Sequence, residues 1–166
     1  MMEGFSKLIK ESHRLEELEK ELKSAYLRGE KKCIKCGFCC HKRTCIPTPN
    51  ELKKIAEFLK LTPKELINKF YAIDIESYGG DYYVKPVGEN TKDLAVKFIP
   101  TERTWNEGKC IFLDEKNHCK IYPVRPISAK LQKCWENETV KDESPTKFWK
   151  DKVLEKEFKI KVEKNV

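Results

Sequence analysis

The sequence predicts a small α+β fold that is mainly helical, with an antiparallel β-hairpin or small sheet inserted after the helices and a cluster of cysteines at its centre. Three observations lead to this fold class. Two marked helix starts precede apolar residues at helical spacing, β-forming residues fill the middle of the chain, and eight cysteines gather in short segments. With 166 residues and no break in composition, we expect a single domain over 1–166 that can bury its own core.

An amphipathic helix is expected at the start of the chain, from about residue 3 to 27. Its apolar residues are Leu8, Ile9, Leu15, Leu18, Leu22 and Tyr26. They are spaced mostly three and four apart, which places them on one face of a helix. The stripe is too short and irregular for coiled-coil heptads, so we expect this helix to pack on its own domain.

Two helix starts with the same capping residues follow, "TPNEL" from Thr48 and "TPKEL" from Thr62. Each has threonine at the N-cap, proline at the first helical position and glutamate three residues after the cap. The threonine oxygen and the glutamate carboxylate then accept hydrogen bonds from backbone N–H groups that have no partner within the helix. The expected apolar faces are Leu52, Ile55, Ala56 and Leu59 in the first helix, and Leu66, Ile67 and Phe70 in the second.

β-structure is expected in the middle of the chain, where "YYVKPV" (82–87) and "LAVKFIP" (94–100) are rich in β-forming residues. Further on, "CIFLD" and "HCKIY" flank "EKN", which predicts a hairpin over about 110–122. In this hairpin Cys110 and Cys119 would lie on facing strands.

Two short helices are expected near the other end of the chain. One begins at Pro126, and the second is opened by Ser144 and Pro145. The apolar positions of the second helix are Phe148, Trp149 and Leu154. The residues after it form either a strand or a frayed tail.

The N-terminal residues carry charges throughout and lack the apolar stretch of a signal peptide. No run approaches the roughly 18 apolar residues of a membrane span. We therefore expect a cytoplasmic protein with no membrane partner, in which thiols stay reduced. A disulfide framework is disfavoured for the same reason, and a bond between the neighbours Cys39 and Cys40 would be strained.

The cysteines point to metal chemistry, because four of them fall within "CIKCGFCC" (33–40). Cys33 and Cys36 are separated by two residues, and Gly37 allows a tight turn that brings both thiolates onto one metal. A third cysteine at the same spacing, Cys39, is typical of ferredoxin-type [4Fe–4S] loops, whereas Cys40 would face a different partner. Metal binding explains eight cysteines, four of them in one short run, better than burial as small hydrophobic residues does. The candidate metal ligands are Cys33, Cys36, Cys39, Cys40, Cys45, Cys110, Cys119 and Cys134.

The formal charge of +7 counts the cysteines as neutral, although metal-bound cysteines are thiolates. The basic residues around the cysteine run either offset this negative charge or form a solvated basic loop. A protein partner stays open, and a nucleic-acid partner is a weaker alternative.

Other residues give weaker signals. His41 and His118 each sit beside a cysteine, and we expect them to be hydrogen-bond donors around the site or surface residues rather than ligands. Arg125 either compensates thiolate charge, which we favour, or pairs with a carboxylate. Neither a Cys–His catalytic pattern nor a nucleotide-binding glycine motif is seen, so the sequence contains no autonomous catalytic motif.

The cysteine run resembles that of the CxxCxxCC cysteine-cluster family, a YkgJ-type zinc- or iron-chelating family. The resemblance continues through "IPTPNELKKIAEFLKLTPKELINKF" and "GKCIFLDEKNHCKIYPVRP", and so covers residues 33 to about 135. It implies a bound metal or iron–sulfur centre, and one branch of the family is associated with lysine N-methylation of flagellin. The family's usual pattern has a cysteine where this chain has Ala129.

We therefore expect a cysteine-cluster metalloprotein with an iron–sulfur centre of the [4Fe–4S] type. A structural zinc domain for protein or nucleic-acid interaction is the first alternative, and protein-lysine N-methylation is the second. Cys134 or Cys45 would replace the cysteine missing at Ala129, and we favour Cys134.

Overall fold

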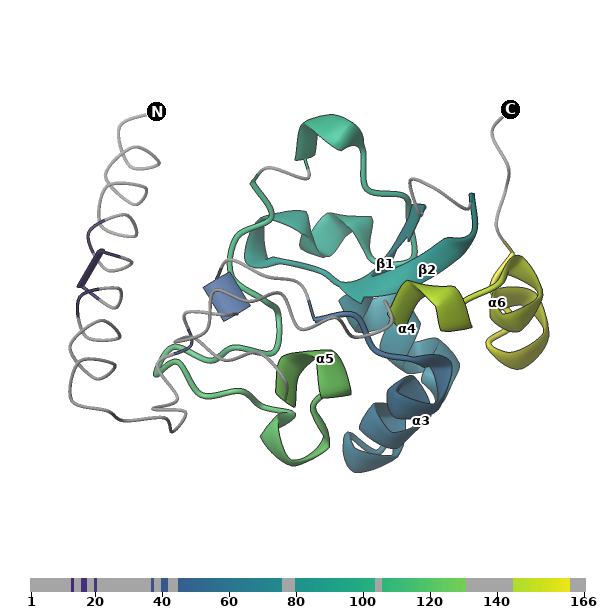
Figure 1. Cartoon of the computed structure of the whole chain (residues 1–166), viewed down its shortest axis with the longest axis horizontal. Helices are drawn as coiled ribbons and strands as arrows, with labels where there is room; N and C mark the ends of the chain where they lie inside the picture. The colour runs from purple at the N-terminus through teal and green to yellow at the C-terminus, as the bar shows by residue number, and fades with distance from the viewer. Residues whose placement is uncertain are drawn as a thin grey trace.

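The computed structural model has a two-stranded antiparallel sheet with helices packed against it, and it confirms the α+β fold class (Figure 1). The structure describes residues 13, 16, 17, 20, 37, 40, 41, 45–75, 80–103, 106–130 and 145–161. Strands β1 (Tyr71–Ile75) and β2 (Tyr82–Pro86) pair in register from Tyr71 opposite Pro86 to Ile75 opposite Tyr82. Helices α3 (Pro49–Phe58) and α4 (Pro63–Phe70) precede the sheet.

Both predicted capping boxes are present. The Thr48 backbone N–H donates to Glu51 Oε2 at 2.8 Å, and the Glu51 N–H donates back to Thr48 Oγ1 at 3.3 Å. Thr62 and Glu65 form the same pair at 2.8 and 3.2 Å. These reciprocal bonds satisfy the first N–H groups of α3 and α4, so both helices begin where the sequence predicts.

The main core lies between one face of the sheet and the helices. Trp149 is wholly buried, donates its indole N–H to the Pro47 carbonyl at 2.7 Å and packs on the Phe158 ring at 5.4 Å. The core includes Leu52, Ile55, Ala56, Leu66, Ile67, Tyr71, Ile73, Tyr82, Val84, Phe112, Ile121, Trp149, Leu154, Phe158 and Ile160. The other face of the sheet has a smaller cluster of Ala72, Val87, Leu94 and Ile99. The predicted apolar faces of α3 and α4 therefore supply much of the main core.

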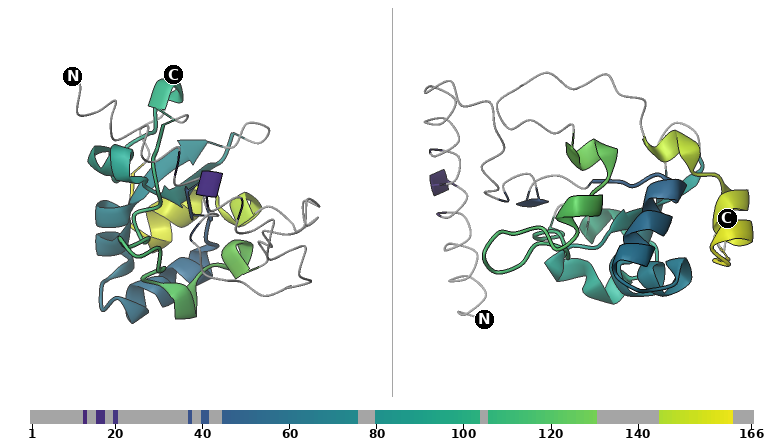
Figure 2. Two further views of the ribbon diagram at one scale, coloured as in Figure 1. Left: turned by 90° about the vertical axis from the view of Figure 1, so that its left-hand side faces the viewer. Right: turned by 90° about the horizontal axis from the view of Figure 1, so that it is seen from below.

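Helix α3 lies between α5 (Ile127–Lys130) and α6 (Asp151–Glu157), as Figure 2 shows. The Ile127 N–H donates to Glu51 Oε1 at 2.7 Å, so the capping glutamate of α3 also holds the start of α5. On the other side, Lys53 Nζ lies 2.6 Å from Glu157 Oε2. The start of α5 agrees with the helix predicted from Pro126.

The strand predicted over 94–100 is wrong, and β1 was not predicted. The chain instead forms the 3-10 helices η1 (Glu89–Leu94) and η2 (Thr101–Arg103), and Val96 between them has a left-handed φ of 60°. The following residues reach the sheet only through a parallel bridge between Ile73 and Phe98. Because one left-handed residue bends the chain out of the extended conformation, the β-forming residues cannot continue as a strand.

The hairpin predicted over 110–122 is shorter than expected, and its cysteines do not face each other. Cys119 bridges Leu113, whereas Cys110 bridges Gly88 in a different segment. The Leu113 N–H donates to the Cys110 carbonyl at 2.9 Å, which turns the chain directly after Cys110. The 3-10 helix η3 (Tyr122–Val124) follows. This early turn separates the two cysteine positions that the sequence pattern paired.

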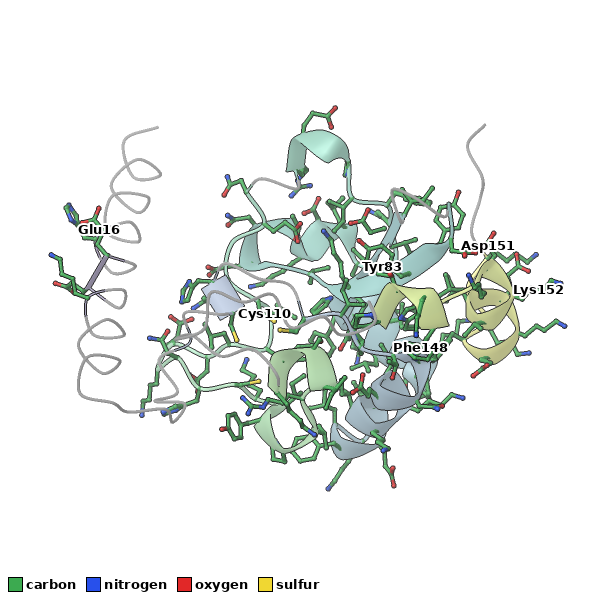
Figure 3. The ribbon with its side chains drawn as sticks, in the orientation of Figure 1. Glu16, Tyr83, Cys110, Phe148, Asp151 and Lys152 are labelled. Carbon is green, nitrogen blue, oxygen red and sulfur yellow. The ribbon has the colours of Figure 1, made fainter. Side chains whose placement is uncertain are left out.

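The helix predicted from Ser144–Pro145 is broken into the 3-10 helix η4 (Pro145–Phe148) and α6. The break comes at Lys150, whose backbone is extended at the N-cap of α6. It directs Trp149 and Leu154 into the core but leaves Phe148 49% exposed, so the assignment of Phe148 to the apolar face is wrong (Figure 3). Phe158 and Ile160 are buried after α6, and the tail beyond 161 lies outside the described residues.

The predicted N-terminal helix falls mostly outside the described residues. Within 3–27 the structure describes His13, Glu16, Glu17 and Lys20, and all four are helical. Among the helices described here, none is long and apolar enough to cross a lipid bilayer.

Candidate metal centre

A backbone hydrogen bond joins the cysteine run to the segment that carries the later cysteines. The Cys110 N–H donates to the Cys40 carbonyl at 2.9 Å, and the Cys40 N–H donates to the Gly37 carbonyl at 2.8 Å. Cys40 and Cys110 are seventy positions apart in the sequence but are neighbours in space. The expected approach of the two cysteine segments is therefore present at this point.

Gly37 has the conformation that the sequence predicted for a tight turn. Its φ is +77°, which is the left-handed region that glycine adopts without steric cost. A Cβ atom at this position would lie 3.0 Å from Asn117 Cβ and 3.2 Å from Leu113 Cδ1. Gly37 therefore also lets the cysteine run pack closely on the turn that precedes Cys119.

Gly88 fixes the position of Cys110. The two residues form an antiparallel bridge, and on either side Glu89 N donates to Lys109 O at 2.8 Å and Ile111 N donates to Val87 O at 3.0 Å. Gly88 is buried, and a Cβ atom there would lie 1.9 Å from the carbonyl oxygen of Glu107. The close approach that glycine permits holds Cys110 against the extension of β2.

Cys119 is positioned by an aspartate turn. The Asp114 Oδ1 atom accepts hydrogen bonds from the backbone N–H groups of Lys116 and His118, both at 2.8 Å. The N–H of His118 holds the pKa of the Asp114 carboxyl below its ordinary value of 3.8; burial opposes this by raising the pKa, and the N–H of Lys116 lowers it further. The ionised carboxylate thus closes the turn that returns the chain to Cys119.

Cys45 lies at the start of the segment that leads into α3. Its neighbour Ile46 accepts a hydrogen bond from Ser128 Oγ at 2.9 Å, so the start of α5 is held beside this segment. Ala129 follows Ser128 directly. The position where the resembling family has a cysteine is therefore next to the Cys45–Ile46 backbone.

Tyr71 is a buried tyrosine whose hydroxyl is influenced by three of the described cysteines. Its side chain is wholly buried, and burial raises the pKa of the Tyr71 hydroxyl well above its ordinary value of 10.0. The charges of Cys110, Cys119 and Cys45, in that order, raise this pKa further. Charges act on a group mainly at short range, and Cys110 and Cys119 both pack against the core cluster to which Tyr71 belongs. Figure 3 shows yellow sulfur atoms gathered around the label of Cys110.

The described residues account for only part of the predicted ligand set. Cys40, Cys45, Cys110 and Cys119 are partly buried, whereas Cys33, Cys36, Cys39 and Cys134 lie outside the described residues. Within the described part of the chain, no three Cys, His, Asp or Glu side chains converge closely enough to bind one metal ion. The preference for Cys134 over Cys45 stays a prediction.

The chemistry of the described donors fits the implied metal. Cys110 and Cys119 are partly buried and pack against the core that contains the Tyr71 hydroxyl, which is wholly buried and has no hydrogen-bond partner among the described residues. Thiolates bind zinc and iron–sulfur clusters, and a phenol O–H can donate to sulfur. In a sulfur-ligated centre the thiolates would therefore bind the metal, and the hydroxyl would donate a hydrogen bond to sulfur.

A cavity of about 170 Å³ opens beside Cys110. Cys110, Ile111 and Leu113 form one side of the cavity. Its charged lining residues are Glu89, Lys92, Lys109, Asp114, Glu115 and Lys120. The cavity gives solvent a path to the vicinity of Cys110.

The histidines and Arg125 take positions that differ from one another. His118 has 63% of its side chain exposed, as expected for a surface residue, and its Nδ1 lies 3.7 Å from Asp114 Oδ2. The Nε2 atom of His41 is buried. The Arg125 guanidinium lies 4.2 Å from the centre of the Tyr122 ring, a cation–π contact that the sequence analysis did not predict.

Comparison with known proteins assigns the chain to a family of metal-chelating domains. The CxxCxxCC family, described as "Putative zinc- or iron-chelating domain", matches residues 32–147. This match spans well over half of the chain, and the chain belongs to this family, as the resemblance implied.

The comparisons with a curated relative and with solved structures are less informative than the family match. The chain is 40% identical over 101 residues to "Uncharacterized protein MJ0661" of Methanocaldococcus jannaschii. The aligned region is 60% of this chain and 42% of the relative, so the chain spans less than half of that protein's length. No solved structure matches the chain.

Sequence reasoning did not find Tyr71 or Gly88. Tyr71 follows directly on the second capped helix, and no motif distinguishes it from an ordinary core tyrosine. Gly88 lies between the β-rich segments 82–87 and 94–100 and belongs to no motif of the sequence. The pairing of Gly88 with Cys110, which gives both residues their role, joins parts of the chain that are 22 residues apart.

Proposed function

We propose that the cysteines hold an iron–sulfur centre of the [4Fe–4S] type. The observation that carries this proposal is the position of the partly buried Cys110 and Cys119, which pack against the core that contains the buried Tyr71 hydroxyl. The Cys40–Cys110 hydrogen bond supports a single centre that draws ligands from both ends of the cysteine-containing region. When bound, such a centre would accept and donate single electrons.

Iron–sulfur chemistry is favoured over zinc by the number and spacing of the cysteines. A structural zinc site is closed by four ligands, whereas this chain has eight cysteines. The run Cys33, Cys36 and Cys39 repeats a two-residue spacing, which a zinc knuckle does not need and which [4Fe–4S] loops use.

We include Cys45 in the ligand set beside Cys40, Cys110 and Cys119. One contact supports this choice, the hydrogen bond from Ser128 Oγ to the Ile46 carbonyl, which holds the residue after Cys45 beside the helix that contains Ala129. The comparison of Cys45→Ser with Cys134→Ser tests it, because both variants remove one thiol and add one hydroxyl. If Cys45 is the ligand, its variant loses bound metal and the Cys134 variant keeps it. The reverse ranking would assign the position to Cys134, as the sequence analysis preferred.

Anaerobic purification with metal and sulfide analysis tests the centre itself. The proposal predicts brown protein that contains iron and acid-labile sulfide in comparable amounts, with visible absorption that bleaches on reduction. Colourless protein with stoichiometric zinc and no sulfide would refute the iron–sulfur centre. It would promote the alternative of a structural zinc domain that binds a protein or, less strongly, a nucleic acid.

Protein-lysine N-methylation is kept as a second alternative because of the family resemblance alone. It predicts methyl transfer from S-adenosylmethionine to a lysine-containing protein, which the first two functions do not. We further propose a cytoplasmic location, since an iron–sulfur centre with partly exposed thiols is best preserved in a reducing compartment.

A further inference from the structure

Tyr71 carries a buried polar group that the fold leaves unsatisfied. Its side chain is 0% exposed, and the hydroxyl has no hydrogen-bond partner among the described residues. Buried polar groups nearly always have a partner, because a buried donor without one costs free energy. A phenylalanine would fill the same space without this cost, so the hydroxyl needs an acceptor that comes within reach only when the metal centre is formed.

The sheet register places Tyr71 and Cys110 on the same face. Tyr71 is opposite Pro86 in the ladder, and two residues further along the same segment Gly88 is opposite Cys110. Side chains two residues apart on an extended segment point to the same side. The Tyr71 ring also lies 5.9 Å from the ring of Phe112, two residues after Cys110. Cys110 and Cys119 both pack against the core cluster to which Tyr71 belongs.

We propose that the Tyr71 hydroxyl donates a hydrogen bond to a metal-bound cysteine sulfur, with Cys110 as the acceptor. This inference rests on the proposed function, because it needs a thiolate that is held by a metal. The phenol is the donor, and packing fixes it at one place. The cysteine sulfur is the acceptor: it is a weak acceptor as a thiol and becomes an anionic thiolate when it binds the metal. Tyr71 would thus be a positioning residue, one that orients a ligand and lowers the electron density on its sulfur.

The hydrogen bond has an electrostatic consequence that a purely structural tyrosine would not have. Reduction adds negative charge to the centre, and the positive end of an O–H dipole stabilises the more negative state. Removal of the donor should therefore lower the reduction potential. It should also loosen the ligand, and loss of such outer hydrogen bonds typically costs about 10- to 100-fold in metal affinity.

Tyr71→Phe in the full chain tests the proposal, because it removes the hydroxyl and keeps the ring against Phe112. Tyr82→Phe is the matched control. Tyr82 is 8% exposed, belongs to the same core and lies at the other end of the same face of the sheet. Three quantities are measured for both variants and the wild type: metal release to a chelator, the midpoint potential of the loaded protein, and the melting temperature of the metal-free protein.

For Tyr71→Phe we expect metal release at least about ten-fold faster and a lower midpoint potential, with a metal-free melting temperature equal to or above that of the wild type. For Tyr82→Phe we expect metal release and potential to match the wild type. If the centre is zinc, the release rates and melting temperatures test the same hydrogen bond. Metal-loaded Tyr71→Phe that matches the wild type in release and potential would overturn this inference alone. A wild-type chain that binds no metal would overturn both this inference and the proposed function.

Discussion

Gly88→Ala tests how the fold positions Cys110. The backbone of Gly88 has an ordinary φ of −86°, so alanine introduces no conformational strain there. The added methyl group would instead lie 1.9 Å from the carbonyl oxygen of Glu107, whereas ordinary contacts begin at 3.4 Å. The segment that contains Glu107 must therefore move away by about 1.5 Å, the difference between these two distances.

This movement has a cost that can be worked out from the contacts. It breaks the hydrogen bond from Asn90 N to Glu107 O at 2.9 Å and strains the bond from Glu89 N to Lys109 O at 2.8 Å. Two backbone hydrogen bonds contribute about 2 kcal/mol, and overpacking of a buried site costs about 1–3 kcal/mol. The free energy of unfolding should therefore fall by about 3–5 kcal/mol, a large share of the roughly 5–15 kcal/mol of an ordinary domain.

Chemical denaturation followed by circular dichroism measures this loss, and Gly80→Ala is the matched control. Gly80 has a left-handed φ of +67°, but among the described residues, its chain neighbours apart, no atom lies within 4 Å of the place where its Cβ would be. Its replacement should cost only the backbone strain of about 1–2 kcal/mol. Because Cys110 moves with the displaced segment, Gly88→Ala should also lower metal occupancy, while Gly80→Ala should not. A loss for Gly88→Ala no greater than that for Gly80→Ala would refute this account of the packing.

Three further predictions concern the interactions that support the site. Glu51→Ala should lower the free energy of unfolding more than Glu65→Ala. Both variants remove a capping box worth about 1 kcal/mol, but only Glu51→Ala also removes the acceptor of the Ile127 N–H at the start of α5. Equal losses in chemical denaturation would contradict this. Lys85→Met should lower the free energy of unfolding by about 3 kcal/mol or more, because the buried Lys85 ammonium lies 2.7 Å from Glu107 and 3.0 Å from Asp74, both partly buried. Lys53→Met, which removes an exposed ion pair, should cost less than about 1 kcal/mol. Similar losses for the two variants would show that the buried ion pairs contribute little. Asp114→Asn should destabilise the protein most at neutral pH, because the Asp114 carboxyl has a lowered pKa in the folded protein. Such a carboxyl stabilises the fold above its unfolded pKa and loses this contribution as the pH falls through its folded pKa. A difference in the free energy of unfolding between variant and wild type that persists well below pH 3.8 would argue against this role.

Local chemistry is what the sequence determined by itself. The capping boxes at Thr48 and Thr62 need only residues within three positions of each other, so neither depends on the rest of the fold. The left-handed turn at Gly37 is local in the same sense. The cysteine run, the capped helix pair and the segment around Cys110 and Cys119 together were sufficient to predict membership of a metal-chelating family, which the family match confirms.

Strand pairing was decided by the tertiary structure. The segment 94–100 has the composition of a strand, yet Val96 turns it away and β1 (Tyr71–Ile75) forms directly after α4 instead. Composition reports a preference for extended backbone, but a strand forms only where another segment supplies its hydrogen bonds. Phe148 is exposed for a related reason, since the break before α6 directs its neighbour Trp149 into the core.

The neighbours of each thiol also depend on the tertiary structure. Spacing alone placed Cys110 opposite Cys119, whereas the fold pairs Cys110 with Gly88 and ties its backbone to Cys40. It also buries the Tyr71 hydroxyl in the core against which Cys110 and Cys119 pack, although no local pattern singles out this tyrosine. The sequence thus determined that the chain carries the cysteine cluster of a metal-chelating family. Only the packing of distant segments decided which groups surround those ligands, because such contacts arise from the shape of the whole core rather than from the order of residues along the chain.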